Sequence, residues 1–395
     1  MGLHTVFALA CAMSVPQEPY WLPRDIEPQN LRAANLNWYR QARLGMFIHW
    51  GVWGPKHAEW AMLYDKIPLD EYQKLAARFR GDDFSAEKIV SLAKRNGFRY
   101  ITFVAKHHDG FCLWQSKWTS WDSADYPVRR DFVRELAAEC RKQNIPLFIY
   151  YSLGIDWVHP AFLPRSRYQF ARPGTPASDA SEQVWNPARF EEYREYCLNQ
   201  LTELCTNYGP IAGFWFDPLG GVLANEDLFR TEEFYSQIRK LQPQALILFK
   251  TGVTGTEDVL VGERELAPIG IHYPGTDPQS VKIRALADIA WAKNSEKQAE
   301  IAVTSQGSWC WNPNATCLPA DQLYKMLEGA SKHSANLLLN FGPKYQGAIP
   351  EDVEREFNGL GNLIRERGYP TPNPDWKEHR TKRSPVDPVK GNTGG

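Results

Sequence analysis

Apolar runs alternate with amphipathic stretches from about residue 20 to residue 368. Eight apolar runs are short enough to be buried strands: 44–48, 100–105, 147–151, 211–216, 245–249, 259–261, 301–303 and 337–341. Helical periodicity lies between several of them, at 85–95, 132–143 and 187–207, and again after Pro343 up to about Arg367. Ser85 is predicted to cap the first of these helices. The alternation predicts an α/β fold, a (β/α)8-like TIM barrel that need not be regular.

Three segments follow from the pattern: residues 1–19, a catalytic barrel over 20–368, and a tail over 369–395. The apolar run at 6–13 resembles a signal peptide, although only His4 precedes it where Lys or Arg is usual. We therefore expect a secreted or periplasmic protein, and a cytoplasmic one if this run is not a signal. No other run approaches the roughly 18 apolar residues that span a bilayer. The Pro-rich, charged tail is predicted to be disordered.

Charge and aromatic content narrow the function. Lys and Arg number 45 against 46 Asp and Glu, a formal net charge of −1. This near-neutral balance argues against a nucleic acid partner, because such proteins usually carry a basic excess. Phe, Trp and Tyr make up 13% of the chain, with 15 tryptophans. Core packing can absorb many of them, but others cluster at the ends of the apolar runs, where rings suit the faces of sugars.

The sequence gives little support for a bound metal or cofactor. None of the seven cysteines forms a CxxC or zinc-finger spacing; Cys310 and Cys317 are close enough to bridge a loop, or both are free thiols. His107 and His108 are adjacent, and adjacent strand residues point to opposite faces. We therefore expect hydrogen bonding to a polar ligand rather than metal binding, with a satisfied core histidine as the alternative for one of them. No cofactor is predicted.

Carboxylates at strand ends are the main candidates for chemistry. The sequence contains no G-x-S-x-G motif and no P-loop, so serine hydrolase and phosphate-binding chemistry have no anchor. Asp217 directly follows a buried run, and Glu263 and Glu265 follow another. Two carboxyl groups across an aromatic pocket suit glycoside hydrolysis, one as nucleophile and one as proton donor. For at least one of the two glutamates, a solvated turn is the alternative.

At these positions the chain resembles the retaining α-L-fucosidases, glycoside hydrolase family 29. The resemblance covers about residues 35–368 and rests on LGMFIHWG at 44–51, EW at 59–60, KHHDGFCLW at 106–114, YYS at 150–152 with DW at 156–157, GFWFD at 213–217 and NLLLNFGP at 336–343. It implies a (β/α)8-like catalytic domain and hydrolysis by double displacement with net retention. The substrate it implies is a fucosylated oligosaccharide or glycoconjugate.

The resemblance also implies roles for single residues. Asp217 matches the nucleophile. The positions that bind the fucose hydroxyls or enclose the ring match His49, Glu59, Trp60, His107, His108, Tyr151 and Trp215. Lys250 stands at a strand end where some members have an arginine. Glu263 is the first candidate for the acid/base, with Glu265 and Glu257 as alternatives.

Other interpretations stay open on the sequence alone. The β-sandwich domain that often follows the barrel in this family is not expected here, and the insertion at 160–185 is a candidate to replace its contribution to the substrate rim. A related exo-glycosidase acting on a galactose-like sugar is the rival among enzymes. An inactive sugar-binding module is the rival outside catalysis.

Overall fold

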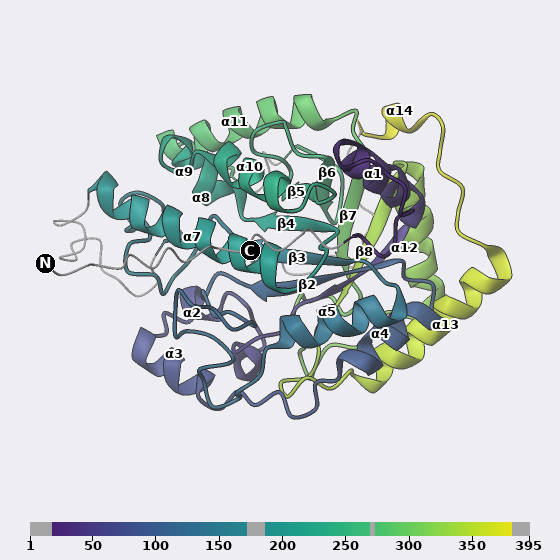
Figure 1. Ribbon diagram of the computed structural model, residues 1–395, viewed down its shortest axis with the longest axis horizontal. Helices are drawn as coiled ribbons and strands as arrows, with labels where there is room; N and C mark the ends of the chain where they lie inside the picture. Colours follow the sequence, from purple (N-terminus) through teal and green to yellow (C-terminus); the bar gives the residue numbers. More distant parts are fainter. Residues whose placement is uncertain (1–17, 172–185, 269–272, 381–395) are drawn as a thin grey trace, which may run out of the picture.

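Eight parallel strands close into a barrel in sequence order, with β8 returning to β1 (Figure 1). The computed structural model describes residues 18–171, 186–268 and 273–380. The strands are β1 Leu44–Ile48, β2 Tyr100–Lys106, β3 Leu147–Ser152, β4 Gly213–Asp217, β5 Leu246–Lys250, β6 Val259–Glu263, β7 Ala299–Thr304 and β8 Ala335–Phe341. The predicted (β/α)8 barrel is confirmed, and every predicted strand is present within two residues at either end.

Helices surround the barrel (Figure 1). They are η1 Pro28–Asn30, α1 Leu31–Ala42, η2 Gly54–Lys56, α2 Ala61–Tyr64, α3 Leu69–Ala76, α4 Ala86–Arg95, α5 Phe132–Gln143, α7 Pro187–Asn207, α8 Leu219–Ala224, α9 Glu226–Phe229, α10 Thr231–Leu241, α11 Pro278–Asn294, α12 Ala320–Lys332, α13 Glu351–Arg367 and α14 Trp376–Arg380. Ser85 caps α4 as predicted, its Oγ accepting the Lys88 N–H at 3.3 Å. Asp131 and Asn186 cap α5 and α7 in the same way, so side-chain oxygens fix where these helices begin.

The strands are buried on both faces because the barrel encloses one core and the helices cover another. Inside the barrel pack residues such as Phe47, Phe148, Leu248 and Leu338. The larger core lies between strands and helices. Parallel strands covered on both faces read as continuous apolar runs, which explains why these eight were visible in the sequence.

Helix α1 closes the amino-terminal end of the barrel. Asn35 donates from Nδ2 to the carbonyls of Ala212 and Gln244, which begin neighbouring strands. One turn later the Tyr39 hydroxyl donates to the buried carboxyl group of Glu300, on β7. The barrel therefore opens at its other end, where the strand carboxyl termini lie.

The expectation of a disordered tail from residue 369 is wrong for residues 369–380. Arg380 is buried, and its guanidinium donates to the carbonyls of His333, Ser295 and Lys297. Tyr369 packs against the large core and donates its hydroxyl to the Gly97 carbonyl. One arginine that satisfies three carbonyl groups is a contact that a composition-based prediction does not see.

Several sequence expectations concern residues outside the described ranges, namely the signal-like run at 6–13, part of the 160–185 insertion and the last 15 residues. Within the described ranges, no helix is both long and apolar enough to cross a membrane. The six cysteines that these ranges contain are all free and buried, so Cys310 and Cys317 are thiols and not a disulfide.

Candidate active site

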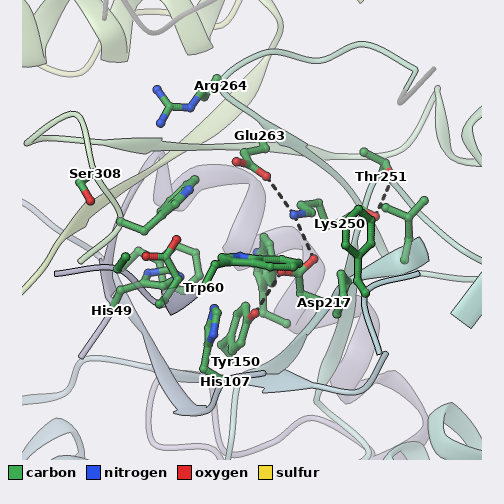
Figure 2. Close-up of a pocket in the computed structure, with 18 of the residues that line it drawn as sticks. His49, Trp60, His107, Tyr150, Asp217, Lys250, Thr251, Glu263, Arg264 and Ser308 are labelled. Carbon is green, nitrogen blue, oxygen red and sulfur yellow. Dashed lines mark hydrogen bonds and ion pairs between the residues drawn. The ribbon is translucent and has the colours of Figure 1, made fainter. Parts of the chain in front are cut away.

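A pocket opens at the carboxyl ends of the strands. Residues from seven strand ends or the loops after them line it, including His49, Glu59, Trp60, His107, Tyr150, Trp215, Asp217, Lys250, Glu263, Glu265 and Trp309. Segments that are far apart in the sequence thus contribute to one cavity (Figure 2). This is the end at which (β/α)8 barrels place their reacting groups.

Asp217 is the last residue of β4 and lies at the floor of this pocket, 6% exposed. The Tyr150 hydroxyl donates to its Oδ2 at 3.0 Å, and Lys250 Nζ lies 3.0 Å from its Oδ1. Burial raises the pKa of Asp217, while the Lys250 ammonium and the Tyr150 hydrogen bond oppose that rise. The site therefore supplies two partners for the ionised form of a buried carboxylate.

Lys250 joins two carboxylates. Its Nζ contacts Glu263 Oε2 at 2.9 Å as well as Asp217 Oδ1 at 3.0 Å (Figure 2). Their charges raise the pKa of Lys250 above its ordinary value, so it remains a cation. Because both contacts are short, the two carboxylate oxygens lie within about 6 Å of each other, close to the separation of about 5–5.5 Å in retaining glycosidases.

The chain turns sharply directly after Lys250 and Glu263. Thr251 has φ 61° and Arg264 has φ 62°, in the left-handed region that L-residues adopt at a cost of about 1–2 kcal/mol. Each backbone N–H still donates to a carbonyl of the next strand at 2.8 Å. These hydrogen bonds hold the two turns and keep Lys250 and Glu263 at the barrel mouth.

Two histidines lie close together near Asp217. His107 and His108 follow the end of β2 in a loop, and their ring centroids are 4.0 Å apart. The expectation that they face opposite sides of a strand is therefore wrong, because the strand ends at Lys106. The ring of His107 stacks on Tyr150, and His108 Nε2 lies 3.9 Å from Asp217 Oδ2. Among the described residues, no group of three or more His, Cys, Asp or Glu is placed to hold a metal ion.

Glu59 and Trp60 form a further part of the pocket wall. Glu59 accepts a hydrogen bond from the Cys310 thiol, with Sγ 3.3 Å from Oε2. Burial raises the pKa of Glu59, and the Cys310 contact works against that rise. The Trp60 ring packs edge-on against His108 and Trp157. A polar carboxylate therefore stands next to an aromatic wall, as a sugar site requires.

Trp215 contributes its ring face rather than its N–H group. Its Nε1 donates to Glu300 Oε1 at 2.9 Å, below the pocket floor, and its ring stacks on Tyr150 at 5.4 Å. Glu300 also accepts from the hydroxyls of Tyr39 and Tyr100. Buried carboxylates are rare without such partners. Glu300 has three donors, and because one of them is the indole N–H, the carboxylate fixes the Trp215 ring beside the nucleophile candidate.

Two residues proposed from the sequence lie elsewhere. Tyr151 points away from the pocket and donates to Gln200 Oε1 on α7 at 2.7 Å, while its neighbour Tyr150 faces Asp217. Glu257 precedes β6 at the opposite end of the barrel, where Tyr235, Asn294 and three backbone N–H groups donate to it. Neither can touch a ligand in the pocket, so these two assignments are wrong.

The structure brings together the other sequence candidates. His49, Glu59, Trp60, His107, Trp215, Asp217, Lys250, Glu263 and Glu265 line the pocket, with His108 directly behind its wall. Sequence reasoning missed Tyr150, Ser152, Glu300, Cys310 and Asn340. All five are buried neighbours of candidates; Cys310 lies in the loop after β7, and the other four belong to, or lie next to, the runs that were identified as strands. The alternation of faces within a strand was the one available signal for Tyr150.

Replacing Lys250 by methionine is expected to move the acidic limb of the kcat/KM–pH profile to higher pH. Lys250 lowers the pKa of Asp217, so its removal raises that pKa. Activity that needs ionised Asp217 is present above this pKa and is lost as the pH falls through it. Lys240→Met, at an exposed position of α10, is the matched control. An unchanged acidic limb in Lys250→Met would show that the ammonium does not act on the reacting carboxylate.

Comparison with known proteins identifies the family. The family model for alpha-L-fucosidase matches residues 17–369. Tissue alpha-L-fucosidase of Mus musculus is 33% identical over 374 residues, covering 88% of this chain and 74% of that protein. Alpha-L-fucosidase 1 of Arabidopsis thaliana is 28% identical over 346 residues, and the match covers 83% of this chain but 60% of that longer protein.

Solved structures of alpha-L-fucosidases are also similar to this chain. Alpha-L-fucosidase isoenzyme 1 from Paenibacillus thiaminolyticus superposes with a TM-score of 0.71 at 28% identity, covering 86% of this chain and 77% of that one. AlfC from Lactobacillus casei, in complex with its alpha-L-fucose product, superposes with a TM-score of 0.66 at 27% identity, covering 84% of this chain and 98% of that one. The chain belongs to the alpha-L-fucosidase family, glycoside hydrolase family 29.

Proposed function

We propose that this protein removes terminal α-L-fucosyl residues from oligosaccharides or glycoconjugates by double displacement. The observation that carries the proposal is the pair Asp217 and Glu263, held by one lysine at the mouth of an aromatic pocket. The two oxygens that Lys250 contacts are at most about 6 Å apart, which is nearer to the carboxyl separation of about 5–5.5 Å in retaining enzymes than to the separation of about 6.5–9.5 Å in inverting ones. The likeness to AlfC, whose structure holds alpha-L-fucose, supports fucose as the sugar.

The reaction balances as two displacements. In the first, Asp217 attacks the anomeric carbon while the bond to the leaving oxygen breaks, and Glu263 gives that oxygen a proton. In the second, Glu263 takes a proton from water as its oxygen attacks the same carbon, and Asp217 leaves as a carboxylate. Tyr150 and Lys250 stabilise the ionised nucleophile at the start and at the end.

The pocket walls fit a sugar that carries a methyl group. Fucose has a methyl where most hexoses have a hydroxymethyl, so part of its surface is apolar. Phe47, Trp215 and Trp309 line the pocket together, and the ring of Phe47 packs against both tryptophans at 5.4 and 6.0 Å. Glu59 and His49 supply polar groups in the same pocket, the mixture of surfaces that small-molecule sites use for orientation and specificity.

A panel of 4-nitrophenyl glycosides tests the proposal. The α-L-fucoside is expected to be hydrolysed with a kcat/KM at least about 100-fold above that of the β-D-galactoside and the β-D-fucoside, because these sugars belong to the opposite enantiomeric series and misplace several groups at once, and one misfitting group alone costs about 10- to 200-fold. Proton NMR at early times should show α-L-fucose before mutarotation. Faster turnover of a galactoside would favour the rival glycosidase, and fucose binding without turnover would favour a sugar-binding module.

A further inference from the structure

The hydrogen bonds of Asn340 determine which nitrogen of His49 carries a proton. Asn340, on β8, donates from Nδ2 to the Trp309 carbonyl at 2.7 Å, and a carbonyl can only accept. The other end of the same amide, Oδ1, therefore faces His49 Nδ1 at 2.6 Å and can only accept from it. The proton of neutral His49 thus lies on Nδ1, and Nε2 is left with a lone pair in a side chain that lines the pocket.

Ser152 determines the proton position of His108 by the same logic. The Ser152 hydroxyl donates its one hydrogen to the Ile155 carbonyl at 2.7 Å. Its oxygen lies 2.8 Å from His108 Nδ1 and must accept from that nitrogen. His108 Nε2 is fully buried and has no hydrogen-bond partner in the described part of the chain. Ser152 lies directly beside Asp217 in the β3–β4 register.

Both rings are neutral, so the tautomer determines which ring nitrogen donates a hydrogen bond and which accepts one. Burial lowers the pKa of His49 to about 3. Burial also holds the pKa of His108 well below its ordinary value, and the nearby Lys250 charge adds to this. A neutral imidazole offers one donor and one acceptor, so a partner that takes the Nδ1 proton leaves an acceptor on the other side of the ring.

We propose that Asn340 and Ser152 are positioning residues that hold His49 and His108 in the Nδ1-protonated tautomer, so that His49 presents only a hydrogen-bond acceptor in the pocket and His108 turns no N–H group toward Asp217. The recognised chemistry is then a hydroxyl group that donates. Deoxy, fluoro or methoxy sugars cannot donate at the same position and are rejected. His107 is the contrast within the site, because its Nδ1 has no partner among the described residues to fix a tautomer.

Ser152 also affects the proposed nucleophile, because the His108 tautomer decides whether an N–H group points toward Asp217. His108 Nε2 is 3.9 Å from Asp217 Oδ2. In the opposite tautomer, an N–H group would stand at Nε2 and donate to this carboxylate. Such a bond would stabilise the Asp217 carboxylate and weaken its attack on carbon, besides removing the acceptor. Ser152 keeps the proton on the far side of the ring, so Tyr150 is the hydroxyl donor that remains on Oδ2.

Long-range ¹H–¹⁵N correlation spectra of ¹⁵N-histidine-labelled enzyme test the tautomers without substrate. His49 and His108, assigned from H49Q and H108Q spectra, are expected as neutral Nδ1–H rings from pH 5 to 8. In Ser152→Ala, His108 should move toward the Nε2–H form, because Asp217 becomes its strongest available acceptor. An Nε2–H ring at either position in the wild-type enzyme overturns the proposal, whether or not any variant folds.

Kinetics separate positioning from general structural damage. Ser152→Ala should lower kcat, and Asn340→Leu should chiefly raise KM, each reducing kcat/KM about 10- to 100-fold. Ser152→Thr retains a hydroxyl and should restore the tautomer and most of kcat. Thr102→Val removes a buried strand hydroxyl that has no hydrogen-bond partner in the described structure, and it should change neither tautomer nor rate.

Substrate analogues complete the test. Among aryl fucosides singly deoxygenated at C2, C3 or C4, at least one should lose less kcat/KM relative to the parent fucoside in Asn340→Leu than in the wild type, since the His49 acceptor is already disturbed. Equal losses in both enzymes would contradict acceptor-based recognition. The inference rests on the proposed function for the identity of the sugar. Nδ1–H tautomers in an enzyme that hydrolyses no fucoside would leave the positioning roles standing and reject only that function.

Discussion

Asp217→Gly is expected to lower kcat on an aryl α-L-fucoside by about 10⁴-fold or more, because no covalent intermediate can form without the nucleophile. Glycine leaves a space at the end of β4 next to Lys250. Added azide should enter that space, attack the anomeric carbon directly and restore part of the turnover. One displacement inverts the configuration, so the product is β-L-fucosyl azide, which NMR identifies.

The control for this variant is another acidic residue of the same barrel. Asp258 lies just before β6, at the end opposite the pocket, and accepts from the Ile247 N–H. Asp258→Asn should retain wild-type turnover and gain nothing from azide. Circular dichroism should show folded protein for both variants. Undiminished hydrolysis by Asp217→Gly would move the nucleophile to another residue.

Glu263→Ala is expected to have the second largest effect, and the size should depend on the leaving group. Substrates with poor leaving groups, such as fucosyl disaccharides, should slow by about 10²- to 10⁴-fold, because the departing oxygen needs a proton. A 2,4-dinitrophenyl fucoside needs almost no such help, so its first step should be nearly unaffected. A plot of log kcat/KM against leaving-group pKa should be steep for Glu263→Ala and shallow for the wild type.

Glu265→Ala is the matched control, since Glu265 lines the same pocket two residues later. Glu263 contacts Lys250, the residue that also contacts Asp217. Glu265→Ala should therefore keep the shallow slope. If it shows the steep slope instead, Glu265 is the proton donor and Glu263 is not.

The fold was predictable because each strand of this barrel is buried on both faces. A run such as 245–249 has apolar residues at successive positions, a pattern that solvent-facing strands do not show. Because both faces are buried, burial does not show which of two adjacent strand residues faces the pocket. Tyr150 and Tyr151 are equally buried and chemically identical, so composition could not separate the one on Asp217 from the one on Gln200.

The candidate site was predictable where a polar residue follows directly on an apolar run. Asp217, Lys250 and Glu263 each end a strand, and that position identified them. Asn340 and Ser152 were not identified in this way, because each is proposed to act through a histidine that follows another strand. Glu257 failed for a related reason, since its place before β6 rather than after it puts it at the other end of the barrel.

Lys250 contacts both carboxylates, and this has a consequence for the order of the two chemical steps. In the proposed mechanism, the negative charge resides on Asp217 and the proton on Glu263 before attack. Once the ester has formed, Asp217 is neutral and Glu263 has lost its proton, so the ammonium serves as counter-ion to the other carboxylate without moving. The total charge of the three groups is the same in both states. In the proposed mechanism, Glu263 becomes negatively charged, and so able to act as a base, when Asp217 loses its charge in the ester. The fixed ammonium group of Lys250 thereby keeps the two half-reactions in sequence.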